Sequence, residues 1–335
     1  MVSSLKTTMI TITPFLKNLF GQKRINLREV SYFLCKSAKS DSYVETLGKH
    51  ADSLHNWIKE SYVEVFVDAF LQEVQLAVRK LRISVPDIVI DFTDEVFYGK
   101  TRNLYTINCK NDCGYSAKFV YANCHLITKG KQIPLMCLPV RLGSHATQTI
   151  KLLRICLNLF SRIRSITFDR GFYSAEIIDF LEKNQIKYQI LVPKKEGALK
   201  KHLGETAGFG VMNHELILNK HKTKKRVPTQ ILACKNTLNY DWLFATNIPF
   251  KSKTECVLAY KKRWQIETNF RVEDESRIKS KSCNFQIRLF YHMIGALLRM
   301  LWVLSKNSGT CVPFKKFLDN LEQDLFFDIY EIRRL

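Results

Sequence analysis

Apolar residues recur at helical spacing through the first quarter of the chain. A segment from 63 to 81 carries its apolar side chains on one face, which predicts an amphipathic helix. A helix start at residue 26 and two short helical segments, 41–50 and 51–58, come before it. Two short helices after a tight join are typical of a helix-turn-helix. A plain helical cap on the core is an equally good interpretation, because this region has few arginines to read bases.

After Pro86 the pattern changes to short apolar runs, which predict strands, interleaved with helical segments. Three early strands followed by alternating helices and strands predict a mixed sheet with helices on both faces. A basic, polar stretch near 195–240 contains two further runs and is interpreted as a β-rich insertion. The predicted strands are 87–92, 117–122, 133–140, 165–168, 188–193, 215–218, 229–233 and 242–247, and the helices are 147–159 and 174–184.

The last third is predicted to be helical, with one helix from 254 to about 274 and a strongly apolar one from 285 to 304. The resulting division has three parts. We expect residues 1–85 to form a helical N-terminal region, DNA-binding if it holds the helix-turn-helix, 86–305 an α/β domain that contains the insertion, and 306–335 a helical tail.

Net charge narrows the possible partners. The 335 residues include 52 lysines and arginines against 31 acidic residues, a formal charge of +21. Such an imbalance causes self-repulsion unless a polyanion offsets it, so nucleic acid is the first candidate and an anionic membrane surface the second. The most apolar stretch is interrupted by His292 and Arg299, so we expect no membrane span, and the N-terminus predicts no signal peptide.

The cysteines indicate a reducing compartment. Ten of them are scattered along the chain, which favours free thiols and a cytoplasmic location. Cys109, Cys113 and Cys124 could supply metal ligands, but the C-x2-C spacing of zinc ribbons is missing. Buried or incidental thiols are the favoured interpretation.

Three acidic residues carry the candidate chemistry. Asp91 and Asp169 follow apolar strand-forming runs, and Glu267 shares a helix face with Tyr260 and Arg263. Arg271 would extend that face by a turn, while Trp264 and Phe270 are expected to face the core. Three carboxylates suit two Mg²⁺ or Mn²⁺ ions that promote an in-line displacement at phosphorus. Singly, each acid could be a turn former, a helix cap or part of a salt-bridge ladder.

Taken together, these motifs resemble DDE transposases of prokaryotic insertion sequences, in the group marked by Tyr-x2-Arg-x3-Glu-x6-Lys. Tyr260, Arg263 and Glu267 match this element, and the segments around Asp91 and Asp169 are similar to those around the family's two aspartates. The resemblance spans about 86–305. It implies a ribonuclease-H-like core, binding of terminal inverted repeats, cleavage at element ends and strand transfer.

The resemblance also implies roles for single residues. Asp91, Asp169 and Glu267 would be the catalytic metal ligands, and a homodimer on paired double-stranded DNA ends would be the working unit. From the chemistry of the residues beside the acids, we expect the DNA contacts to come from Tyr260, Arg263, Arg271, Lys261, Lys262 and Arg170.

One position departs from the pattern: Asp274 stands where the signature has lysine, and Lys279 and Lys281 lie nearby. A stand-alone nuclease, or a repurposed copy that only binds DNA, therefore stays open as an alternative.

Overall fold

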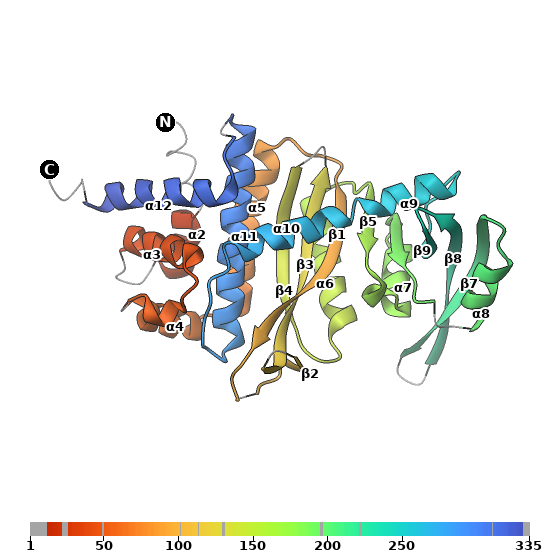
Figure 1. The fold of residues 1–335 in the computed structure, drawn as a ribbon, viewed down its shortest axis with the longest axis horizontal. Helices are drawn as coiled ribbons and strands as arrows, with labels where there is room; N and C mark the ends of the chain where they lie inside the picture. The colour runs from red at the N-terminus through yellow and green to blue at the C-terminus, as the bar shows by residue number, and fades with distance from the viewer. Residues whose placement is uncertain are drawn as a thin grey trace.

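The computed structural model describes residues 12–21, 26–48, 50–100, 102–112, 114–128, 131–194, 197–220, 223–309 and 311–330. A helical N-terminal region leads into one long sheet, and a β-hairpin lies at the far end of that sheet (Figure 1). The helices of the N-terminal region are α2 (Ile12–Phe20), α3 (Leu27–Lys39), α4 (His50–Glu60) and α5 (Val63–Lys80).

The predicted start of α3 is confirmed, because the side chain of Asn26 accepts hydrogen bonds from the backbone N–H groups of Arg28 and Glu29. The predicted helix over 41–50 is wrong. Only a 3₁₀ turn, η1 (Val44–Thr46), forms there, and Tyr43 instead makes an isolated bridge to Lys279. The backbone of this segment is thus satisfied by a distant partner, which local sequence patterns do not reveal.

Within the described residues the sheet has nine strands in the order β2-β3-β1-β5-β6-β9-β8-β7, with β4 paired to β3. β5 and β6 run parallel to β1, whereas β3 and β9 are antiparallel to their neighbours, so the mixed sheet is confirmed. The strands are β1 (Asp87–Phe97), β2 (Thr106–Asp112), β3 (Tyr115–Thr128), β4 (Lys131–Val140), β5 (Ser165–Phe168), β6 (Tyr188–Leu191), β7 (Phe209–Lys220), β8 (Thr223–Thr237) and β9 (Tyr240–Thr246).

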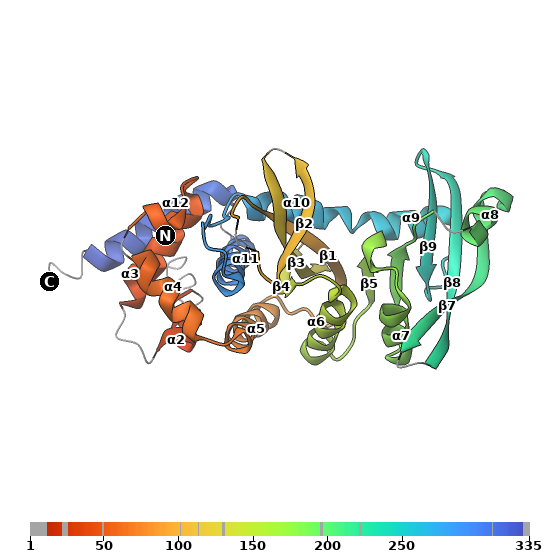
Figure 2. The same cartoon turned by 90° about the horizontal axis from the view of Figure 1, so that it is seen from below.

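The inserted hairpin β7–β8 does not form a separate unit, because β8 pairs with β9 and so extends the same sheet. The remaining elements are α6 (His145–Leu159), η2 (Arg170–Phe172), α7 (Ala175–Lys183), α8 (Gly197–Glu205), α9 (Lys253–Lys261), α10 (Trp264–Asp274), α11 (Phe285–Asn307) and α12 (Phe314–Tyr330). Figure 2 shows α9 and α10 along one face of the sheet and α6 and α7 against the other, as predicted.

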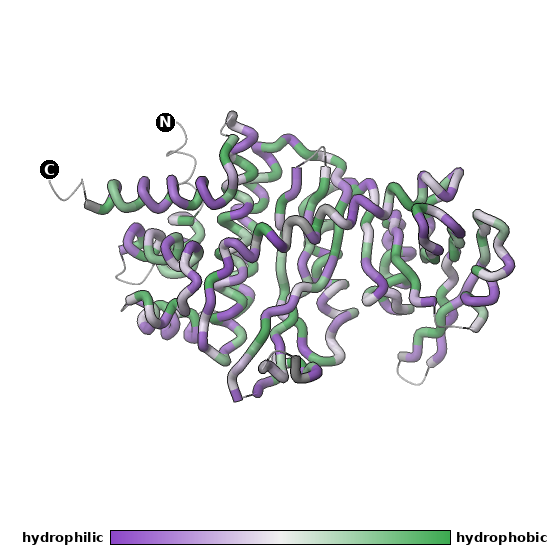
Figure 3. Tube along the Cα trace, in the orientation of Figure 1, coloured by the Kyte–Doolittle hydropathy of each residue, from purple (hydrophilic) through white to green (hydrophobic). Residues whose placement is uncertain are grey.

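Hydrophobic residues gather in the central strands and the helices packed on them (Figure 3). Among the described helices, α11 alone is long and apolar enough to cross a membrane, yet 83% of its most apolar window is buried inside the protein. Phe290, Ile294 and Leu297 on this helix are fully buried. The position of α11, packed between the N-terminal helices and the sheet, therefore accounts for its apolar composition.

Candidate catalytic site

Asp91 and Asp169 occupy equivalent places on two neighbouring parallel strands. The last paired residues of β1 and β5 are Ile90 and Phe168, and each aspartate comes directly after its pair. β5 ends there and turns into η2, whose Phe172 stacks on Phe92 at 4.2 Å between ring centroids. β1, however, continues to Phe97 along β3. The interpretation of Asp91 as a strand-end residue is therefore wrong: it lies in mid-strand, where its neighbour β5 ends.

The helix α10 brings Glu267 to this place. Ile266 packs into a small buried cluster with Val89 of β1 and Ile127 of β3. The predicted single helix over 254–274 is interrupted at Lys262–Arg263. There the N–H groups of Arg263 and Ile266 bond to the carbonyls of Tyr260 and Arg263, three residues earlier. Spacing alone did not distinguish one continuous helix from two helices joined by this tighter turn.

Arg263 joins the first and third acids. Its guanidinium donates from Nη1 to Asp91 Oδ2 at 2.5 Å and from Nη2 to Glu267 Oε1 at 2.9 Å. The arginine side chain is only 8% exposed, whereas that of Glu267 is 50% exposed. A buried cation thus lies between two of the predicted metal ligands, and charge-assisted hydrogen bonds hold it there.

Tyr260 connects the second acid to the same network. Its hydroxyl accepts a hydrogen bond from Arg263 Nε at 3.0 Å and donates to Asp169 Oδ1 at 3.3 Å. The Tyr260 ring is fully buried against Trp242 and Phe244 of β9. The three predicted acids are therefore brought together by one tyrosine and one arginine.

Burial sets the electrostatics of the site. It raises the pKa of Asp91 to about 6, against the lowering effect of Arg263 and of the Phe92 N–H, which donates to Asp91 Oδ1. The negative charge of Asp169 adds to the increase. Burial also raises the pKa of the Tyr260 hydroxyl, which therefore stays protonated as a donor. A cation would relieve this accumulation of acidic groups.

The donor chemistry fits a divalent metal, since Mg²⁺ and Mn²⁺ prefer carboxylate oxygens. Within the described residues, no three acidic, histidine or cysteine side chains are grouped closely enough to hold an ion. Arg263 now neutralises Asp91 and Glu267.

The remaining predicted DNA contacts lie around this network. Lys261 places its Nζ 4.8 Å from the ring centroid of Trp264, and Lys262 lies 4.0 Å from Asp87. Arg170 and Arg271 are exposed. The expectation that Trp264 faces the core is wrong, since it is 43% exposed beside the site, and the side chain of Phe270 lies outside the described residues.

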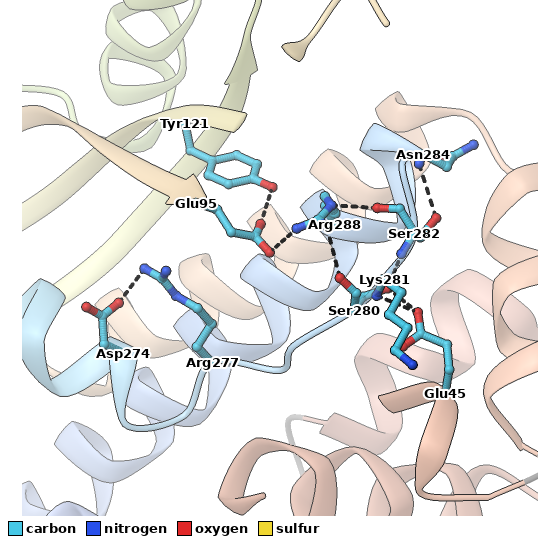
Figure 4. A network of polar contacts seen from close by, with 10 residues as sticks. All are labelled: Glu45, Glu95, Tyr121, Asp274, Arg277, Ser280, Lys281, Ser282, Asn284 and Arg288. Carbon is cyan, nitrogen blue, oxygen red and sulfur yellow. Dashed lines mark hydrogen bonds and ion pairs between the residues drawn. The ribbon is translucent and has the colours of Figure 1, made fainter. Parts of the chain in front are cut away.

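An ion pair on β1 near these acids was not predicted from the sequence. Glu95 binds Arg288 of α11 and also accepts a hydrogen bond from the Tyr121 hydroxyl at 3.0 Å (Figure 4). Glu95 lies four residues beyond Asp91, on the same strand face. Strand alternation was the available signal, but the predicted strand stopped at residue 92.

The cysteines show no metal site within the described part of the chain. Cys124 is buried, with its Sγ 3.2 Å from that of Cys156, and Cys109 is partly exposed. Cys113 lies outside the described residues. Buried thiols thus account for Cys124.

Comparisons with known proteins identify the family and the fold. The family described as "Transposase DDE domain" matches residues 88–302, which include all three acids. A cryo-EM structure of a piggyBac transposase synaptic complex with hairpin DNA is similar, with a TM-score of 0.64 at 12% sequence identity. The similarity covers 98% of this chain and 81% of that chain, and it shows the ribonuclease-H-like fold. No curated protein matches the chain.

Proposed function

Because the chain belongs to the transposase DDE domain family of polynucleotidyl transferases, we propose that it moves an insertion sequence by acting at that element's ends. It would bind the terminal inverted repeats, cleave the DNA there and join the freed 3′ ends to a target. The convergence of Asp91, Asp169 and Glu267 on Arg263 and Tyr260 supports this proposal most strongly.

Each residue of the network has a chemical role in the proposed reaction. DDE transposases generally use divalent metals, and Asp91, Asp169 and Glu267 would hold one or two Mg²⁺ or Mn²⁺ ions. The bound ions would activate the attacking oxygen and stabilise the leaving oxygen. Once released from the acids, Arg263 would contact a DNA phosphate through its planar guanidinium, and Tyr260 would orient Asp169.

Double-stranded DNA is the proposed partner, and two copies of the chain on paired ends are the proposed working unit. The net charge of +21 supports a polyanionic ligand. The exposed cations beside the acids, Lys262, Arg170 and Arg271, support contacts to the DNA backbone close to the cleavage point.

A cleavage assay tests this function. Supercoiled plasmid carrying the DNA segments that flank this coding region is incubated with the protein in MgCl₂ or in EDTA. We expect magnesium-dependent nicks at the element ends from wild type and none from Asp169→Asn. Asp94→Asn is the matched control, because Asp94 lies on β1 but bonds to Lys118 at the surface. Retained nicking by Asp169→Asn would refute the assignment.

Product analysis separates the alternatives. Wild-type products joined to target DNA are expected from a transposase. Nicks without any joined product would instead indicate a stand-alone nuclease, and binding without nicks would indicate a repurposed DNA-binding copy.

A further inference from the structure

The segment between α10 and α11 has an alternating pattern of exposure. Ser276, Ile278 and Ser280 are buried, whereas the intervening Arg277, Lys279 and Lys281 reach solvent to differing degrees. The backbone around Lys279 is extended and bridges to Tyr43. Residues two apart on such a backbone are about 6.7 Å apart and point the same way. We call Arg277, Lys279 and Lys281 the basic track.

The backbone of the basic track is fixed from both sides. Glu45 accepts hydrogen bonds from the Ser280 hydroxyl at 2.6 Å and from the Lys281 backbone N–H at 2.9 Å. On the other side, Arg288 donates to the Ser280 carbonyl at 2.9 Å while it also pairs with Glu95 (Figure 4). The lysine side chains are thus presented by a backbone that is held by hydrogen bonds on both sides.

The basic track lines a groove of about 640 Å³ between the N-terminal region and β1. Among the described residues, four basic and two acidic side chains line this groove. The buried pair of Glu95 with Arg288 neutralises one charge of each sign. Asp41 is fully exposed and lies 3.2 Å from Lys279, a surface pair that contributes little. Tyr43 and Tyr98 give the groove exposed aromatic walls, so it suits an anionic strand with stacking groups.

One end of the basic track lies near the catalytic acids. Arg277 donates to Asp274, so the charge at this unexpected acidic position is paired (Figure 4). Both residues line a small cavity with Thr93, which lies two residues beyond Asp91 on the same face of β1. That separation is about 6.7 Å along the strand. A DNA strand leaving the acids would therefore pass Arg277 first and the two lysines next.

We infer that the basic track binds successive phosphates of one DNA strand and carries it from the catalytic acids into the groove beside the N-terminal region. The inference rests on the proposed function, because it assumes that DNA is the ligand. Arg277 then makes the cationic contact with DNA that the signature lysine would make at position 274. Asp274 holds Arg277 in place.

The salt dependence of DNA binding tests the basic track. The probe is a short fluorescein-labelled duplex of arbitrary sequence, and its Kd is measured by anisotropy over a KCl series in EDTA. The triple variant Arg277→Gln, Lys279→Gln, Lys281→Gln should reduce the slope of log Kd against log[KCl] by about 2.7, since each phosphate contact contributes about 0.9. Equal thermal melting of variant and wild type establishes that the variant folds.

A matched triple variant controls for the loss of net charge. Lys151→Gln, Arg154→Gln and Lys183→Gln remove the same charges from exposed positions on α6 and α7, on the other sheet face (Figure 2). We expect the wild-type slope from this control. Equal slopes in the two triple variants would contradict phosphate binding by the basic track. They would not contradict the proposed cleavage at the element ends. Wild type that fails to bind the duplex at any salt concentration would overturn the proposed function as well.

Discussion

Arg263 and Asp91 form a buried ion pair at the centre of the site, with Nη1 2.5 Å from Oδ2 and side chains only 8% and 13% exposed. The same guanidinium also bonds to Glu267 and Tyr260. In this state the arginine supplies the positive charge that the acids require. Binding of a divalent cation and release of Arg263 toward DNA are therefore coupled in our account.

Removal of this arginine should destabilise the metal-free protein. Arg263→Gln leaves Asp91 buried without its partner, and breaking such a pair costs about 3–5 kcal/mol. Urea unfolding in EDTA measures the loss. Arg271→Gln, an exposed change one turn beyond Glu267, should stay within about 0.5 kcal/mol of wild type. Equal stabilities for the two variants would contradict the central position of Arg263.

The same variant should bind metal more tightly. Without Arg263 the acids no longer carry a competing cation, so calorimetry should show a lower Kd for Mn²⁺ in Arg263→Gln than in wild type. Weaker binding would mean that the arginine assists the metal rather than competing with it.

Asp91 should make stability depend on pH. Burial raises its pKa from 3.8 to about 6, so the folded protein holds this proton more tightly than the unfolded chain. The stabilisation is fully present below about pH 4 and is lost as the pH rises through 6; two pKa units correspond to about 3 kcal/mol. Asp91→Asn should remove this part of the pH profile in EDTA. Asp94→Asn should keep it.

Glu73 on α5 should also make the stability depend on pH, over a neighbouring pH range. It is buried, and burial raises its pKa from 4.5 to about 7. Stability from its protonated form is lost as the pH rises from 4.5 through 7. Glu73→Gln should therefore raise the Tm at pH 8 relative to wild type and leave it nearly unchanged at pH 4. A lower Tm at pH 8 would show that the carboxylate has a stabilising partner.

Two ion pairs on β1 should differ sharply in strength. Glu95–Arg288 has side chains 15% and 5% exposed, whereas Asp94–Lys118 has side chains 44% and 29% exposed. Arg288→Met should cost about 3–5 kcal/mol, because it leaves the buried charge of Glu95 without its cation. Lys118→Met should cost at most about 1 kcal/mol. Comparable losses in urea unfolding would contradict the burial difference.

Local patterns predicted the elements better than their pairing. The helix at 63–81 and the cap at Asn26 follow from spacing and side-chain chemistry, and both are confirmed. The length of β1 was underestimated because its second half is held by β3, twenty or more residues away in sequence. The helix predicted over 41–50 was wrong for the same reason, since the backbone of Tyr43 and Val44 pairs with that of Lys279.

The acids were found by residue type and position, but their arrangement was not. Sequence spacing placed Tyr260, Arg263 and Glu267 on one face and so predicted that they act together. It gave no sign that Arg263 would reach Asp91, 172 residues away in sequence, or that Tyr260 would bond to Asp169. The contact of Arg263 with Asp91 depends on the packing of Ile266 of α10 against β1 and β3. The contact of Tyr260 with Asp169 depends on the packing of α9 against β9.

Anomalous diffraction from crystals soaked in Mn²⁺ tests the three-acid site most directly. We expect a manganese peak bound to the carboxylates of Asp91 and Asp169, with the Arg263 guanidinium displaced from Asp91. A peak bound only to other residues, or Arg263 still paired with Asp91 at saturating manganese, would contradict it.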